Sequence, residues 1–262
     1  MDSVSTYKPL CSSVSRVRVL LVGPVGAGKS SFFNSINSVF RGHVTSQAMA
    51  GCSATSLTTQ HPERPHAGLL PGKTLSLNLC YVNYDLSNSP LFLLCPSSLL
   101  HLYPSAPPPM FNASAPLHSE SHGYRASPEL KDKIHCVVFV LDACKISIMP
   151  EKLEAKLTAV RRKANLLGIP QLALVTKVDE ACPIVKDDLT SVYKSPYLKD
   201  LDASARLGLP LSCVLPLKNY SEELELHVPV DILVLSALLQ ILRFADNYFD
   251  DVTDRANNCD TK

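Results

Sequence analysis

A glycine-rich segment, Gly23 to Ser30, constrains the fold of this chain more than any other feature. It reads Gly-Pro-Val-Gly-Ala-Gly-Lys-Ser and fits the pattern G-x-x-x-x-G-K-[ST] of a phosphate-binding loop. Residues 16–22 before it are apolar and β-branched, as in a strand, and residues 31–40 after it carry apolar side chains at helical spacing. The alternative is a glycine turn that only joins a strand to a helix. Because the strand and helix are the context that such a loop requires, we interpret the segment as a phosphate-binding loop.

The residue types of this loop suit phosphate chemistry. Glycines let successive backbone N–H groups curl around phosphate groups, the Lys29 ammonium neutralises their charge, and the Ser30 hydroxyl is a ligand for Mg²⁺. Ser30 is therefore the predicted metal ligand. The predicted phosphate-binding residues are Gly23, Val25, Gly26, Ala27, Gly28, Lys29, Ser30 and Ser31.

A second motif, Thr176-Lys177-Val178-Asp179, follows the apolar residues 172–175 and fits [NT]-K-x-D. The Asp179 carboxylate can accept two hydrogen bonds from guanine, a pair that adenine cannot donate, and the Lys177 stem would lie along the base. The alternative is an ordinary charged turn after a strand. Because the motif comes after a phosphate-binding loop and at a strand end, we interpret Thr176, Lys177 and Asp179 as guanine-binding.

A third loop, Leu217-Lys218-Asn219-Tyr220, follows the last predicted strand. A short base-contacting loop is typical of GTPases at this place, so Lys218 and Asn219 are further candidates. A solvated loop without a binding role is the alternative.

The order of apolar segments predicts the fold class. Runs at 134–141, 172–175 and 211–217 read as strands, and 150–167 and 231–251 as helices. Alternating strands and helices predict an α/β, doubly wound, mostly parallel sheet. The phosphate-binding loop and the [NT]-K-x-D motif make the expected fold P-loop GTPase-like. We place an N-terminal tail at 1–15, the domain at 16–252 and a C-terminal tail at 253–262.

An unusual segment, residues 61–128, interrupts this domain. It holds eleven of the chain's 20 prolines, and between Gly42 and Ser119 the only acidic residues are Glu63 and Asp85. Such a composition excludes a regular helical layer, so we expect a poorly structured, disordered insert.

Composition excludes other classes of protein. With 46% hydrophobic residues, 19% charged residues and a net charge of +1, the chain has the composition of a globular domain, and nothing in its charge favours nucleic acid. Nine cysteines without a Cys-x-x-Cys pair indicate reduced thiols in the cytoplasm. Residues 1–15 have no apolar core, and Leu91 to Leu102 is too short to span a bilayer, so we expect no membrane span.

One expected motif is missing. GTPases carry Asp-x-x-Gly after the third strand, and none of the ten glycines here has an aspartate three residues earlier. Glu120 to Gly123 is the nearest match, without a strand before it. Asp142 ends a strand and could be the acid that bridges to the metal. However, it lies only 34 residues before Thr176, which indicates that its strand is the one immediately before the base-reading strand, so we do not interpret Asp142 as the metal-bridging acid. GTPases also use a threonine that reaches Mg²⁺. The sequence does not select which residue this would be among Thr45, Thr55, Thr58 and Thr59.

Long blocks of the sequence resemble the interferon-induced protein 44 family, in its 44-like branch. The resemblance covers residues 7–60 and 111–252 and is carried by the blocks at 22–35, 41–47, 130–136, 174–179 and 231–238. It implies a P-loop GTPase-like domain, GTP or GDP binding with Mg²⁺, a cytoplasmic location, and induction in antiviral and immune responses.

Two departures from the family stand out. Some members carry an N-terminal TLDc domain, for which this chain has no room. The family's Asp-x-x-Gly segment should lie between Gln60 and Phe111, where the proline-rich insert stands instead. A retained intron or a mispredicted exon would explain the abrupt change, and the chain would then lack its third strand.

We therefore expect an interferon-induced guanine-nucleotide-binding protein with weak or absent hydrolysis. The alternative from another class is a non-catalytic scaffold or interaction protein built on a degenerate GTPase domain, with protein partners or self-association. An ATP-dependent kinase or ATPase is a third hypothesis, against which Asp179 argues.

Overall fold

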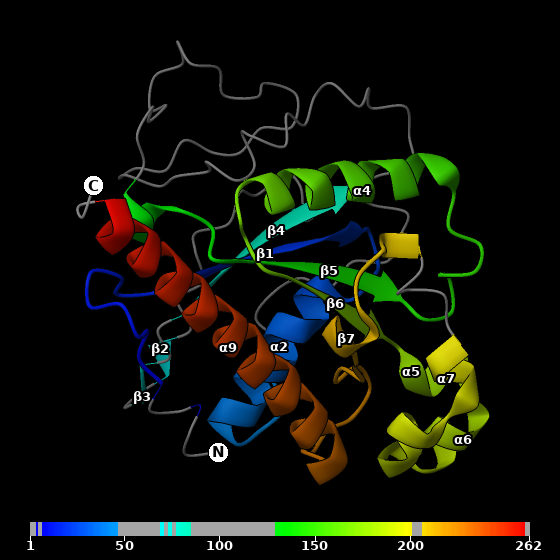
Figure 1. Ribbon diagram of the computed structural model, residues 1–262. Coiled ribbons are helices and arrows are strands. Elements are labelled where there is room, and N and C mark those ends of the chain that lie inside the picture. Colours follow the sequence, from blue (N-terminus) through cyan, green and yellow to red (C-terminus); the bar gives the residue numbers. More distant parts are fainter. Residues whose placement is uncertain are drawn as a thin grey trace.

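The computed structural model describes Val4 and residues 7–46, 69–70, 73–74, 77–84, 129–200 and 206–259. Its centre is a five-stranded sheet in the order β4-β1-β5-β6-β7, and every neighbouring pair in it is parallel (Figure 1). The strands are β1 (Val17–Pro24), β4 (Leu77–Tyr84), β5 (Cys136–Asp142), β6 (Gln171–Thr176) and β7 (Val214–Pro216). A separate antiparallel pair joins β2 (Leu69–Leu70) to β3 (Lys73–Thr74).

Helices cover both faces of this sheet. Figure 1 shows α4 (Glu151–Leu166) on one face and α2 (Lys29–Arg41) with α9 (Val228–Cys259) on the other. The remaining helical segments are short, and they are η3 (Leu130–Asp132), α5 (Val178–Ala181), α6 (Pro183–Asp187), η4 (Leu189–Lys194), α7 (Pro196–Asp200) and η5 (Leu211–Cys213). The predicted α/β doubly wound fold is confirmed.

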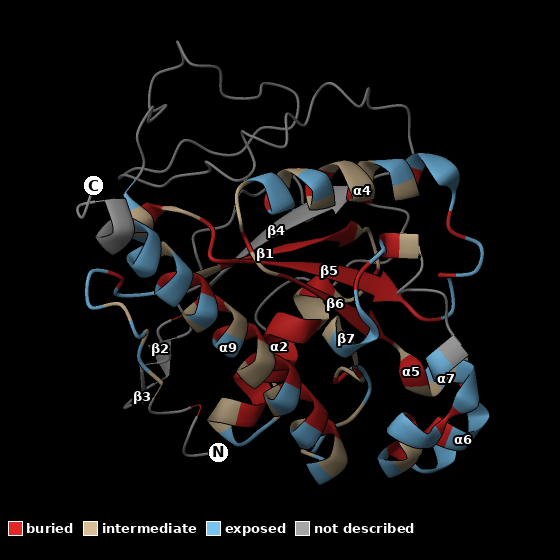
Figure 2. Cartoon of the chain, in the orientation of Figure 1, coloured by how far each residue is buried: buried red, intermediate tan, exposed pale blue. Residues whose placement is uncertain are grey.

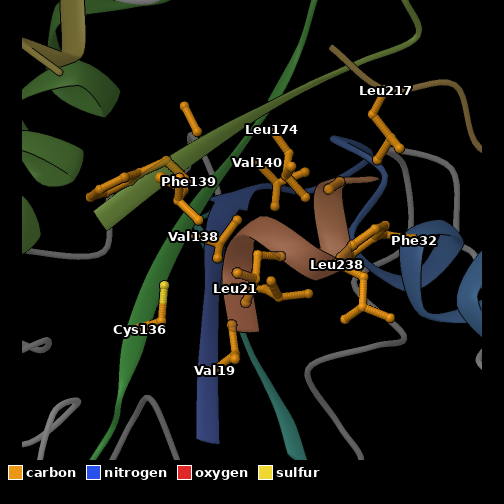
Figure 3. Packing of buried hydrophobic residues seen from close by; sticks show 14 of the residues in the cluster. Val19, Leu21, Phe32, Cys136, Val138, Phe139, Val140, Leu174, Leu217 and Leu238 are labelled. Carbon is orange, nitrogen blue, oxygen red and sulfur yellow. The ribbon is translucent and has the colours of Figure 1, made fainter. Parts of the chain in front are cut away.

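The core lies between the sheet and its two helical layers. All seven residues of β5 are buried, as expected of a parallel strand covered on both faces (Figure 2). On the other side of the sheet from α4, Leu21 of β1, Phe32 of α2 and Leu238 of α9 belong to one cluster of fully buried side chains (Figure 3).

Helix α9 is a core element of this domain. Among the described residues, Val228–Arg255 is the one segment long and apolar enough, by length and composition, to cross a membrane, and 44% of its apolar window is buried here. The helix contacts β1, β5 and β6, and Val234 and Ile241 on its inner face are 0% exposed. It ends at Cys259, beyond the predicted boundary at residue 252.

Residues 7–15, predicted as a tail, lie against α9. The Tyr7 hydroxyl donates a 2.6 Å hydrogen bond to Oδ1 of Asp246, and the Val14 side chain is buried. Burial and the neighbouring Asp246 carboxylate raise the pKa of Tyr7 well above its usual range, so the phenol stays protonated and keeps this hydrogen bond.

Strand β4 corrects one expectation from the sequence. The suggestion that the chain lacks a third strand is wrong, because β4 pairs with β1 in parallel along its whole length, from Val17 opposite Leu77 to Pro24 opposite Tyr84. Most of the predicted insert, 61–128, lies outside the described residues.

The strand order predicts a ligand site at the carboxyl end of β1. Of the strands in the main sheet, β4 comes after β1 in the sequence and pairs with one edge of β1. The next strand in the sequence, β5, pairs with the opposite edge of β1. Ligands of doubly wound sheets bind at the carboxyl ends of the strands where the order reverses in this way. The Gly23–Ser30 segment leaves β1 at this point.

Candidate functional site

The glycines of the loop after β1 are required by its geometry. A Cβ on Gly23 would lie 2.2 Å from the carbonyl oxygen of Val140 in β5, so no larger residue fits there. Gly26 and Gly28 have φ angles of 77° and 94°, in the left-handed region that side chains rarely adopt. The loop therefore turns sharply into α2, as the sequence pattern predicts.

The amino end of α2 lies directly after this loop. Gly28 precedes its first residue and, having no side chain, gives the first backbone N–H groups of the helix no side-chain cap. Uncapped N–H groups at a helix amino terminus carry partial positive charge and suit an anion.

Lys29 is the first residue of α2 and is 5% exposed. Its Nζ donates hydrogen bonds to the carbonyl oxygens of Gly23, at 2.8 Å, and Pro24, at 2.7 Å. Burial lowers the pKa of Lys29 to about 7, because removal from water disfavours the charged ammonium. An anion in the loop would restore the charged form.

Thr176 connects the second motif to the loop. Its hydroxyl lies within hydrogen-bond distance of the carbonyl oxygens of Ala27, at 2.7 Å, and Leu141, at 3.1 Å, and its side chain is fully buried. The residue predicted to bind guanine thus braces the phosphate-binding loop against the ends of β5 and β6.

Lys177 and Asp142 form an ion pair beside this brace. Lys177 has a left-handed backbone with φ of 58°, and its Nζ lies 2.9 Å from Oδ2 of the buried Asp142. Asp142 Oδ1 accepts a 3.0 Å hydrogen bond from the backbone N–H of Cys144. Burial alone would lower the pKa of Lys177, but the Asp142 carboxylate outweighs this and raises it.

Asp179, the predicted base-reading residue, contacts the third loop. Its Oδ2 lies 3.3 Å from Nζ of Lys218, which also lies 3.1 Å from Oε1 of Glu223. The side chains of Asp179 and Lys218 are 22% and 25% exposed, so water still reaches both.

Asn219 joins the third loop to the first. Its Nδ2 donates to the carbonyl oxygen of Gly28 at 3.3 Å, and its Oδ1 lies 3.3 Å from the hydroxyl of Ser35 in α2. The same hydroxyl accepts a 3.0 Å hydrogen bond from the backbone N–H of Tyr220. Asn219 therefore connects the third loop to the phosphate-binding loop and to α2. Ser35, which the sequence analysis did not single out, makes a second connection between α2 and the third loop.

The three segments that the sequence singled out therefore meet at one edge of the sheet. Thr176 contacts Ala27, Asn219 contacts Gly28, and Lys218 contacts Asp179. The arrangement offers an anion site in the loop and a carboxylate beside it.

The other candidates are placed differently. The Thr45 backbone N–H donates to the Ser38 hydroxyl near the carboxyl end of α2, about 13 Å along the helix from Lys29. Asp142 ends β5, which neighbours β6, as its sequence position indicates. Thr55, Thr58, Thr59 and the segment Glu120–Gly123 lie outside the described residues.

No protein-family model matches the chain. Among solved structures, it is similar to a probable GTP-binding protein engB, with a TM-score of 0.39, 10% identity, and coverage of 87% of this chain and 99% of that one. It is also similar to the signal recognition particle receptor complex SRb-GTP/SRX from Chaetomium thermophilum, with a TM-score of 0.34, 14% identity, and coverage of 79% and 94%. The fold assignment rests on the strand order and the loop geometry, not on these distant likenesses.

Curated relatives are much closer in sequence. Interferon-induced protein 44-like from Homo sapiens is 38% identical over 256 residues, which cover 96% of this chain and 56% of the relative. Interferon-induced protein 44 is 36% identical over 260 residues in Homo sapiens and 35% identical over 268 residues in Mus musculus, again over 96% of this chain and over 57% and 60% of the relatives. The chain thus spans little more than half the length of these relatives. Over 96% of its own length, this chain is a homologue of the interferon-induced protein 44 and 44-like proteins.

Proposed function

We propose that this chain is a guanine-nucleotide-binding protein that takes GTP or GDP together with Mg²⁺. The observation that carries the proposal is the 2.7 Å hydrogen bond from Thr176 to Ala27, which fixes the base-reading segment to the phosphate-binding loop. One nucleotide can then reach both, with its phosphates in the loop and its base beside Asp179.

The loop residues fit a phosphate chain. Gly26 and Gly28 adopt left-handed φ angles, Gly28 gives α2 no side-chain cap, and the Lys29 side chain is already buried against the loop. Phosphate oxygens would replace the carbonyl oxygens of Gly23 and Pro24 as acceptors for Lys29. Val25, Ala27 and Ser31 would contribute backbone N–H groups, and Ser30 would hold Mg²⁺.

The base site rests on Asp179. Asp179 lies in the first turn of α5, shortly after β6 ends at Thr176. The residue before α5, Lys177, gives this helix no side-chain cap. A carboxylate accepts the two N–H donors on the edge of guanine and repels the ring nitrogen that adenine presents, so the site favours GTP over ATP.

Weak or absent hydrolysis remains part of the proposal. Hydrolysis needs a second acid at the metal and a backbone N–H that senses the γ-phosphate, both supplied after the third strand. In the sequence, β4 is followed by Asp85-Leu86-Ser87-Asn88, so an asparagine stands where that motif has glycine. These four residues lie outside the described part of the chain.

The relatives' names support a role in the interferon response. Both are called interferon-induced, and we propose that this chain is likewise induced by interferon, acts in antiviral immunity and works in the cytoplasm.

Titration of the purified chain with fluorescent GTP and ATP analogues, with and without Mg²⁺, tests the proposal. We expect saturable binding of GTP, weaker binding of ATP, and loss of most affinity in Lys29→Ala. Lys186→Ala, at an exposed position on α6, removes the same charge and should bind as the wild type does. Equal affinity of Lys29→Ala and wild type would contradict the assignment of the loop.

A further inference from the structure

The ammonium of Lys218 lies between two carboxylates of different character. Its Nζ is 3.3 Å from Asp179 Oδ2 and 3.1 Å from Glu223 Oε1. Burial alone would lower the pKa of Lys218, but the contacts with Glu223 and Asp179 outweigh it and raise the pKa. Lys218 is therefore charged at neutral pH and holds both acids.

Glu223 is the more firmly fixed of the two acids. Its Oε2 accepts hydrogen bonds from the backbone N–H groups of Ser221, at 2.9 Å, and Glu222, at 3.2 Å, which leaves Oε1 directed to Lys218. Partial burial would raise the pKa of Glu223, but the backbone N–H groups of Ser221 and of Glu223 itself, together with Lys218, lower it to about 2. The carboxylate is thus ionised throughout the physiological range.

We propose that Lys218 is an internal competitor of guanine, which occupies the Asp179 carboxylate in the nucleotide-free protein and moves to Glu223 alone when the base binds. Recognition of guanine needs both oxygens of that carboxylate, and Lys218 engages one of them. This inference rests on the proposed function, since it concerns the same base site.

Glu223 makes this exchange favourable. An ammonium that left Asp179 without another partner would lose its ion pair entirely, whereas Lys218 keeps the fixed carboxylate 3.1 Å away. Glu223 is accordingly a positioning residue, which acts on the base site only through Lys218.

A different role for Lys218 predicts the opposite sign. If Lys218 contacted the nucleotide directly, its removal would weaken binding. If it competes with the base, its removal frees Asp179 and strengthens binding. Because the Lys218–Asp179 pair is partly exposed, the expected change is about two- to five-fold, the range of such ion pairs.

The test is the dissociation constant of the full chain for a fluorescent GDP analogue, measured for the wild type, three variants at Lys218 and Glu223, and two control variants. Lys218→Met should bind about two- to five-fold more tightly than wild type, and Glu223→Gln more weakly by a similar factor, because Lys218 then pairs with Asp179 alone. The double variant should match Lys218→Met, since Glu223 has no effect without Lys218. Lys186→Met and Glu225→Gln, at exposed positions, make the same charge changes and should leave the constant unchanged.

Each outcome decides the question. Weaker binding in Lys218→Met, or additive effects in the double variant, would overturn the proposal that Lys218 competes with guanine. The proposed function would still stand in that case, provided that the wild type binds the guanine nucleotide. If the wild type binds no guanine nucleotide, both proposals are overturned. A thermal unfolding curve for each variant verifies that the fold is kept, and Lys218→Gln, with a shorter polar side chain, replaces Lys218→Met if the latter does not fold.

Discussion

The Thr176 hydroxyl lies 2.7 Å from the carbonyl oxygen of Ala27, so that two motifs 149 positions apart in the sequence meet through one buried hydrogen bond. The same hydroxyl lies 3.1 Å from the carbonyl oxygen of Leu141, which ties the end of β5 to the same point. Thr176, which the sequence predicts to bind guanine, therefore holds the phosphate-binding loop in place.

Replacement of Thr176 by valine should destabilise the protein by about 1–3 kcal/mol, the typical loss when a buried hydrogen bond loses one partner. Thr176→Ser keeps the hydroxyl and should lose less. Chemical denaturation of both variants measures the difference, and equal stability of Thr176→Val and wild type would show that the brace is not needed.

Lys29 should make the stability of the nucleotide-free protein depend on pH. Its folded pKa is lowered to about 7 from a usual value of 10.5, so between these values the unfolded chain binds more protons than the folded one. The free energy of unfolding should therefore rise as pH increases from 7 toward 9. Lys29→Met should lose this rise in the same denaturation series.

Nucleotide binding should show the reverse dependence. Phosphates favour the charged ammonium, so binding above pH 7 should take up a proton, and affinity should fall as pH rises toward 9. Calorimetry in buffers of different ionisation enthalpy measures the proton uptake. Binding that is independent of pH over this range would mean that Lys29 is charged in the free protein as well.

Gly28→Ala should disturb the site more than Gly42→Ala. Both glycines have left-handed φ angles, 94° and 75°, so each substitution brings backbone strain of about 1–2 kcal/mol. A Cβ on Gly28 would in addition lie 3.0 Å from Asn219 Nδ2 and 3.3 Å from Thr176 Cγ2, whereas no atom of the described residues lies within 4 Å of one on Gly42. We expect Gly28→Ala to lower the free energy of unfolding more than Gly42→Ala does, and to lose GTP affinity, whereas Gly42→Ala should keep it.

The parts of the site that the sequence predicted are those with a short, contiguous pattern. The loop at Gly23–Ser30 and the motif at Thr176–Asp179 each carry their chemistry within a few residues, and their positions at strand ends are confirmed. Strand β4 was missed because it is stabilised by pairing with β1, a long-range contact, and stands among prolines without a clear period. The pairs Lys177–Asp142 and Lys218–Asp179 were missed for the same reason, since only the folded chain brings their charges together.

Base selectivity should depend on Asp179. Asp179→Asn replaces two acceptors by one acceptor and one donor, so affinity for GTP should drop while affinity for xanthosine triphosphate should rise, because xanthine has a carbonyl where guanine has its amine. Competition titrations with GTP, xanthosine triphosphate and ATP measure the change. If ATP competes as well as GTP in the wild type, Asp179 does not read the base.

The last prediction is that the chain binds GTP better than it hydrolyses it. Strand β4 ends at Tyr84, opposite Pro24, and the next residues in the sequence are Asp85-Leu86-Ser87-Asn88. A glycine at the fourth position is what allows a backbone N–H to approach the γ-phosphate in GTPases, and asparagine at residue 88 should hinder this. We expect measurable binding with slow single-turnover hydrolysis in the wild type, and faster hydrolysis in Asn88→Gly at unchanged GTP affinity. Asn112→Gly, outside this segment, is the control for the substitution itself. If the wild type hydrolyses GTP rapidly and Lys29→Ala abolishes this activity, catalysis proceeds without the Asp-x-x-Gly motif. Asn88 would then not be the residue that limits hydrolysis.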